Sequence, residues 1–120
     1  MIIAYYSITG NVKRFVDKLS LPSVEIDPAN PFLSIDEPFI VVAPTYERDL
    51  TEPINDFIEN NDLSNFKGVM GSGNLNFADL YVFTAKDIAK EYNVPLLYSF
   101  EYSGTNEDIE KINTILGDIK

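Results

Sequence analysis

The sequence predicts one α/β domain: a doubly wound parallel sheet of five strands in the order 2-1-3-4-5, with helices on both faces. Two observations predict this fold. Short apolar runs alternate with segments whose apolar residues recur at helical spacing, which is the pattern of β-α-β units. The chain has 120 residues, of which 45% are hydrophobic, so one domain with a substantial core is expected over residues 1–120.

The first elements are a strand, a helix and a short second strand. Residues 2–6 form a continuous apolar run, typical of a strand buried on both faces. A helix is then indicated by the i, i+3, i+4, i+7 spacing of Val12, Phe15, Val16 and Leu19. Residues 24–26 give the second strand. Prolines are dense around the crossover at 27–38, so we expect a loop there without a full helix.

The central strand is predicted at residues 39–43, and a helix follows it. Thr51 is expected to be the N-cap of this helix, with Glu52 and Pro53 in its first turn. The apolar face of the helix would consist of Ile54, Phe57 and Ile58.

The second half of the sequence predicts two strands and two helices. Residues 67–70 form a fourth strand that leads into a glycine-rich loop at 71–74, and residues 95–100 form a fifth. The helix between these strands carries Tyr81, Ala85, Ile88, Ala89 and Tyr92. Thr105 and Asp108 resemble a capping box. The last helix would bury Ile109, Ile112, Leu116 and Ile119.

The composition excludes several kinds of chemistry. Because the chain has no cysteine and no histidine, it can form no disulfide, thiol nucleophile, iron–sulfur centre, usual zinc site or serine–histidine triad. Any redox chemistry must therefore come from a bound cofactor. The net charge of −10 argues against nucleic acid or an anionic membrane as a partner and permits a basic protein. No targeting or membrane-spanning segment is recognisable, so we expect a cytoplasmic protein.

Ligands of doubly wound sheets bind beyond the carboxyl ends of the strands, where the strand order reverses. The first of these loops consists of Ser7, Ile8, Thr9, Gly10 and Asn11, with a helix from about Val12. Its hydroxyls and backbone N–H groups, at the positive end of a helix dipole, can hold a phosphate without a basic side chain. It lacks the glycine–lysine pair of a P-loop and the glycines of a dinucleotide fingerprint. An ordinary capped turn is the plain alternative.

Two further loops converge on the same place. Thr45 and Tyr46 follow the third strand, where a tyrosine ring can lie against a flat ligand. The loop after the fourth strand contributes small residues, amides and a second aromatic residue: Ser72, Gly73, Asn74 and Phe77. Each loop alone is as well explained by packing or by a tight turn. A phosphate cradle and two aromatic loops together favour flavin mononucleotide (FMN). Phospho-receiver domains and small tyrosine phosphatases are excluded, because the required aspartates and cysteine are missing.

With these loops placed, the sequence resembles the NrdI family, flavodoxin-like flavoproteins associated with class Ib ribonucleotide reductase. The resemblance covers nearly the whole chain. It rests first on Thr9, Gly10, Asn11, Val12, Arg14 and Phe15, and on Gly68, Val69, Ser72, Gly73, Asn74, Asn76 and Phe77. It rests also on Val94, Pro95, Phe100, Glu101, Ser103, Gly104 and Thr105.

The resemblance implies a redox-active activator, not an enzyme with a substrate of its own. A flavin or thiol reductase system would reduce the FMN. The reduced flavin would give superoxide or another oxidant to the dimanganese small subunit of the reductase, where a tyrosyl radical forms. The alternatives are a general one-electron flavodoxin and a flavin-free docking scaffold. No side chain is expected to act as a catalytic acid or base or to bind a metal.

The resemblance also assigns the cofactor-binding residues. The phosphate would be held by Ser7, Thr9, Gly10, Asn11 and Val12, with Ile8 among them. The isoalloxazine ring would lie beside Thr45, Tyr46 and Glu47, and its other side would be enclosed by Ser72, Gly73, Asn74 and Phe77.

One stretch departs from the family. Many members have glycines just after the position of Tyr46, where this chain has Glu47, Arg48 and Asp49. A backbone flip beside the flavin should then be harder, because a left-handed non-glycine residue costs about 1–2 kcal/mol. The two carboxylates would also disfavour an anionic reduced flavin, although Arg48 can offset one of them. We therefore expect a lower second reduction potential than in relatives with glycines. Alternatively, these side chains face solvent and have no effect.

Overall fold

The structure is a computed structural model that describes residues 1–119, except for the side chains of residues 77–79. Its strands are β1 (Ile2–Tyr5), β2 (Ser23–Glu25), β3 (Phe39–Ala43), β4 (Phe66–Gly73) and β5 (Leu96–Glu101). All neighbouring strands are parallel, and the sheet order is β2-β1-β3-β4-β5. The predicted fold class and strand order are therefore confirmed.

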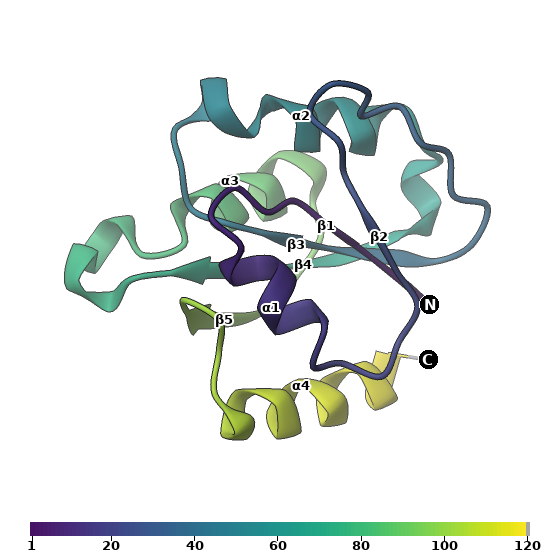
Figure 1. Cartoon of the computed structure of the whole chain (residues 1–120). Coiled ribbons are helices and arrows are strands. Elements are labelled where there is room, and N and C mark those ends of the chain that lie inside the picture. The colour runs from purple at the N-terminus through teal and green to yellow at the C-terminus, as the bar shows by residue number, and fades with distance from the viewer. Residues whose placement is uncertain (120) are drawn as a thin grey trace.

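Helices cover both faces of the sheet (Figure 1). One face is covered by α2 (Arg48–Glu59) and α3 (Phe83–Tyr92), and the other by α1 (Asn11–Val16) and α4 (Asn106–Ile119). On the first face Phe39 packs edge-on against Phe57, with ring centroids 5.5 Å apart. On the second face Phe15 stacks on Phe100 at 3.8 Å. The two short 3-10 helices, η1 (Leu63–Asn65) and η2 (Leu75–Leu80), were not predicted.

β4 is longer than the sequence predicted. Residues 71–73, which were expected in a loop, continue the strand and pair with β5, as in Gly71 with Ser99 and Gly73 with Glu101. Close packing explains why the strand contains glycine. A Cβ on Gly71 would lie 2.7 Å from the Cβ of Ala85, so a larger residue would push α3 off the sheet. The loop after β4 therefore begins only at Asn74.

α2 begins one turn earlier than predicted. Glu47, in an extended conformation, is the N-cap, and its carbonyl accepts hydrogen bonds from the N–H groups of Leu50 and Thr51. The prediction that Thr51 caps the helix was wrong, because this residue is buried inside it. Pro53 also lies inside the helix, where its missing N–H removes one intrahelical hydrogen bond. The segment 47–49 is thus the start of a helix and not a free loop.

Most of the remaining expectations hold to within a residue or two. The crossover before β3 has no helix, as predicted. Thr105 and Asp108 form the predicted capping box: the Thr105 N–H donates to Asp108 Oδ2 at 2.8 Å, and the Asp108 N–H donates to Thr105 Oγ1 at 3.2 Å. Leu19 lies beyond the end of α1 but is buried, and Tyr81 precedes α3. Within the described residues, no helix has the length and apolarity needed to cross a membrane.

Candidate functional site

A cavity of about 460 Å³ opens at the carboxyl ends of the central strands. This volume lies in the range of small-molecule sites, about 300–1,000 Å³. The prediction for Phe77 lies outside the described side chains. All the other residues that we expected to bind the cofactor line the cavity except Gly10. The lining residues that were not among the expected ones are Pro44, Leu50, Leu80, Phe83 and Tyr102.

The loop after β1 lines the cavity and carries backbone N–H groups without a partner among the described residues. Gly10 has a φ of 94°, which a residue with a side chain rarely adopts, and this conformation leads directly into α1. The N–H groups of residues 9–12 donate to no other described residue, so an anion can accept from them. The helix dipole is smaller than expected, because α1 has only 6 residues. An anion at this loop would therefore depend more on hydrogen bonds from the N–H groups than on the helix dipole.

Hydroxyl groups tie the neighbouring loops together. Thr45 Oγ1 donates to the Ser72 carbonyl at 2.6 Å, and Ser72 Oγ donates to the Tyr102 carbonyl at 2.6 Å. The buried hydroxyl of Thr84 holds Tyr46 twice, because it accepts from the Tyr46 N–H at 3.1 Å and donates to the Tyr46 carbonyl at 2.8 Å. The hydroxyls of Thr45 and Ser72 thus fix the protein backbone and do not donate into the cavity.

Only one of the two acidic residues in the segment 47–49 lines the cavity. Glu47 does, whereas Asp49 does not. Arg48 cannot offset Glu47, because its guanidinium pairs with Glu91 at 2.8 Å and with Glu52 at 3.0 Å. The hydrogen bonds that Arg48 donates to Glu91 and then to Glu52 raise the pKa of Arg48 above its ordinary value. None of residues 47–49 has a positive φ, and the cost of a backbone flip at this segment stays a prediction.

Tyr102 is the lining residue that sequence reasoning most clearly missed. It follows β5, has a positive φ of 51°, and is 51% exposed. Its N–H donates to the Gly73 carbonyl at 3.1 Å, which joins it to the end of β4. A signal was available in the sequence, because the turn after the fifth strand lies at the same edge of the sheet as the other three loops. Together with Tyr46 and Phe83, it contributes an aromatic side chain to the described lining of the cavity.

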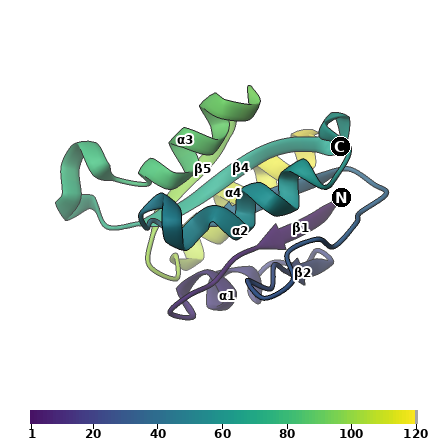
Figure 2. The same ribbon diagram turned by 90° about the horizontal axis from the view of Figure 1, so that it is seen from above.

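The η2 segment extends beyond the carboxyl edge of the sheet (Figures 1 and 2). The Leu75 N–H donates to Glu101 Oε2 at 3.2 Å, which ties the start of the segment to β5. At its other end Leu80 lines the cavity and is 60% exposed. With Ile8, Leu50 and Tyr102, Leu80 forms an apolar rim around the cavity mouth.

A parallel sheet of this order, with a cavity at the strand ends, defines the flavodoxin-like class of proteins. Two solved structures share the fold. A short-chain flavodoxin associated with a bacterial microcompartment is 22% identical, with a TM-score of 0.64 over 98% of this chain and 94% of that chain. A flavodoxin of Streptococcus pneumonia TIGR4 is 24% identical, with a TM-score of 0.63 over 98% of this chain and 95% of that chain.

The family follows from the sequence comparisons. The model of the NrdI flavodoxin-like family matches residues 3–114. Protein NrdI of Bartonella henselae is 39% identical over 115 residues, which cover 91% of this chain and 87% of that protein. The chain belongs to the NrdI flavodoxin-like family. Membership of a flavodoxin-like family implies a flavin as the class of cofactor.

Proposed function

We propose that the protein binds FMN in this cavity and acts as a redox accessory protein of class Ib ribonucleotide reductase. The observation that carries the proposal is that one cavity combines the two kinds of group that FMN requires. Residues 9, 11 and 12 line the cavity and have N–H groups with no acceptor among the described residues, which suit a phosphate. Tyr46, Phe83 and Tyr102 add aromatic side chains to the lining, which suit a flat ring.

The residues of the chain would divide the work of holding the cofactor. The loop of residues 7–10 would receive the phosphate, and Asn11 and Val12 would complete that end. Thr84 would keep the Tyr46 backbone in place, so that the wall beside the ring is formed before the ligand arrives. Leu50 and Leu80 would exclude water from the ring edges. When bound, the flavin would supply the redox chemistry, the reduction of dioxygen to superoxide.

The partner would be the metal-bearing small subunit of the reductase. The oxidant made at the flavin of this protein would react at the dimanganese centre of that subunit, where a tyrosyl radical would form. A net charge of −10 would steer the protein towards a basic surface, and this attraction should weaken with salt. The apolar rim of Ile8, Leu50, Leu80 and Tyr102 would then be covered by the partner.

Cofactor binding can be tested with a pair of glycine variants. Gly10→Ala places a side chain at a positive φ, with its Cβ 2.8 Å from Arg14 NH1, and should weaken FMN binding by at least about 10-fold. Gly117→Ala is the matched control, because a Cβ there meets no atom within 4 Å. Affinity is measured from the quenching of flavin fluorescence. A wild-type protein that stays colourless after incubation with FMN would contradict the proposal and favour a flavin-free scaffold.

The redox role is tested with the reduced protein. In the presence of oxygen it should release superoxide, and a tyrosyl radical should form, seen by electron paramagnetic resonance, only when manganese-loaded small subunit is added. Fast electron transfer to unrelated acceptors without superoxide release would instead identify a general one-electron carrier.

A further inference from the structure

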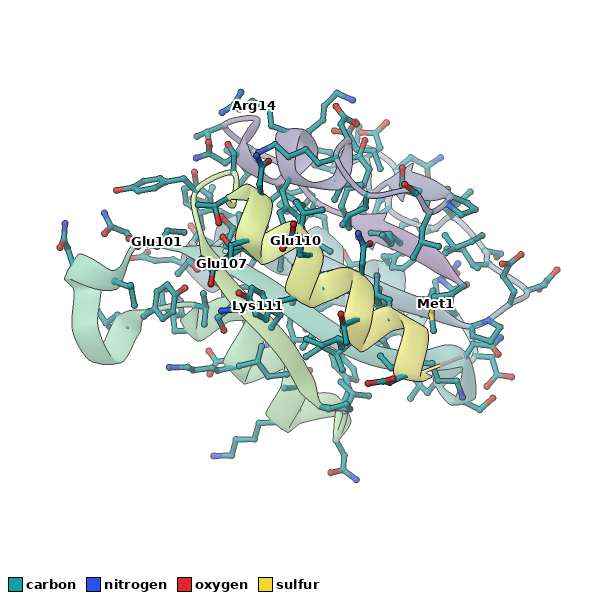
Figure 3. All side chains as sticks on the ribbon, turned by 90° about the horizontal axis from the view of Figure 1, so that it is seen from below. Met1, Arg14, Glu101, Glu107, Glu110 and Lys111 are labelled. Carbon is teal, nitrogen blue, oxygen red and sulfur yellow. The ribbon has the colours of Figure 1, made fainter. Side chains whose placement is uncertain are left out.

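Arg14 lies beside the phosphate loop without lining the cavity. Figure 3 shows it where α1 approaches the turn after β5. Its guanidinium donates from NH2 to Asn11 Oδ1 at 2.7 Å and from Nε to Ser103 Oγ at 3.2 Å. No carboxylate of a described residue lies within 4.0 Å of it, whereas Lys13 and Arg48 are both paired with carboxylates. In a chain with 19 acidic residues, this arginine is therefore held by neutral groups.

These contacts fix the orientation of the Asn11 amide. A guanidinium can only donate hydrogen bonds, so the Asn11 atom that it contacts must be the oxygen. The Ser103 hydroxyl donates to the same oxygen at 3.0 Å, and both lone pairs are then occupied. The amide nitrogen, with its two N–H donors, points away from Arg14 and bonds no other described residue. Asn11 itself lines the cavity.

We propose that Arg14 is a positioning residue which, with Ser103, holds the Asn11 amide so that its N–H groups face the phosphate of the ligand. The inference rests on the proposed function, because it assumes a flavin with a phosphate monoester at this end of the cavity. It adds a specificity role: Arg14 makes the site prefer FMN to riboflavin, which has the same ring and no phosphate.

The test compares both flavins on the apo-protein by fluorescence titration. Arg14→Met and Asn11→Ala should each weaken FMN binding by about 10-fold, because a hydrogen bond to a charged group is lost, and should change riboflavin binding by less than about 2-fold. In the Asn11→Ala background, Arg14→Met should weaken FMN binding by less than about a further 2-fold, since Arg14 acts through Asn11.

Lys18→Met is the matched control. The Lys18 ammonium donates to the carbonyls of Ser103 and Gly104 at 3.2 and 3.3 Å, so it holds the same turn without contacting Asn11. This variant should keep the wild-type ratio of FMN to riboflavin affinity. If Arg14→Met does not fold, Ser103→Ala removes the second donor instead and should lower the same ratio by a smaller factor.

Four outcomes would overturn the inference. A full 10-fold loss from Arg14→Met in the Asn11→Ala background would mean that the guanidinium charge acts on the phosphate directly. Equal losses for both flavins would mean a general structural role. An unchanged FMN affinity, with wild-type protein that binds FMN, would remove the role of Arg14 and leave the proposed function intact. Wild-type protein that binds neither flavin would overturn both.

Discussion

The two walls of the cavity differ in how firmly the protein holds them. The α2 wall, residues 45–50, is fixed by both Thr84 bonds to Tyr46, by the Thr45 bond to Ser72 and by the Tyr6 hydroxyl, which donates to the Leu50 carbonyl at 2.9 Å. The η2 wall, residues 74–80, projects from the sheet and presents exposed Leu75 and Leu80. The α2 wall is preformed by these bonds. In the η2 wall, the described side chains of Leu75 and Leu80 are more than half exposed, and we expect this wall to adjust to what binds.

The largest expected effect comes from breaking the α2 wall at Thr84. Thr84→Val keeps the shape of the side chain but leaves the N–H and carbonyl of Tyr46 without their partner. We expect a loss of about 1–3 kcal/mol in the free energy of unfolding, and a fall in Tm of about 5–10 °C by calorimetry. Thr114→Val, which removes an exposed hydroxyl from α4, should change Tm by less than about 2 °C. Equal changes in Tm for the two variants would show that the bonds of Thr84 to Tyr46 contribute no more stability than the exposed hydroxyl of Thr114.

A smaller effect, with a defined pH dependence, is expected at Tyr6. Burial raises the pKa of its hydroxyl above the ordinary value of 10.0, so folding favours the neutral form. The stability from its bond to Leu50 is complete below about pH 10 and is lost as pH rises through the higher folded pKa. Tyr6→Phe should cost about 1 kcal/mol at pH 7, and the difference from wild type should shrink above pH 10 in thermal melts. A constant difference up to pH 11 would contradict this.

A substitution in the η2 wall should change the affinity for FMN and leave the stability of the protein nearly unchanged. Leu80→Ser removes an exposed apolar side chain from the cavity, so Tm should stay within about 2 °C while FMN affinity falls about 3-fold. Leu63→Ser is the matched control, because Leu63 is 53% exposed and does not line the cavity. A large fall in Tm for Leu80→Ser would mean that the two walls do not differ in the way described.

The smallest expected effect is electrostatic. Glu47→Gln removes the carboxylate that lines the cavity and should raise the second flavin potential by about 20 mV, where about 59 mV corresponds to a tenfold change for one electron. Asp49→Asn, at a residue outside the lining, should leave the potential unchanged in the same redox titration. An equal shift for both variants would indicate a general effect of net charge.

The order of the elements could be predicted because the hydrophobic periodicity of each element is local. The start of α2 could not be predicted, because Thr51 and Pro53 are stronger local signals of a helix start than Glu47. The extra turn is held by a distant contact, the Tyr6 hydroxyl on the Leu50 carbonyl. The end of β4 was missed for a similar reason, since Gly71 is explained by packing against Ala85, and Gly73 by packing against Val82 and Tyr81.

Part of the candidate site could likewise be predicted from the sequence, and part could not. Its three predicted loops follow from topology alone, because parallel strands end at one edge of the sheet. Thr84 was missed because its bonds to Tyr46 join residues 38 positions apart. The difference between Glu47 and Asp49 depends on where α2 begins, which the sequence did not reveal. The orientation of Asn11 needs Ser103, 92 positions away.

The cavity also has a consequence for the order of events in synthesis. Its lining begins at Ser7 and ends at Tyr102, the turn after the last strand. A chain leaves the ribosome from its N-terminus, and strands that pair over long separations fold slowly. The loop that begins at Ser7 is therefore made well before Tyr102, and the cavity is complete only after β5 and the turn that follows it have been made. A nascent or truncated chain that ends before β5 would carry the residues of the phosphate loop without the ability to retain the cofactor.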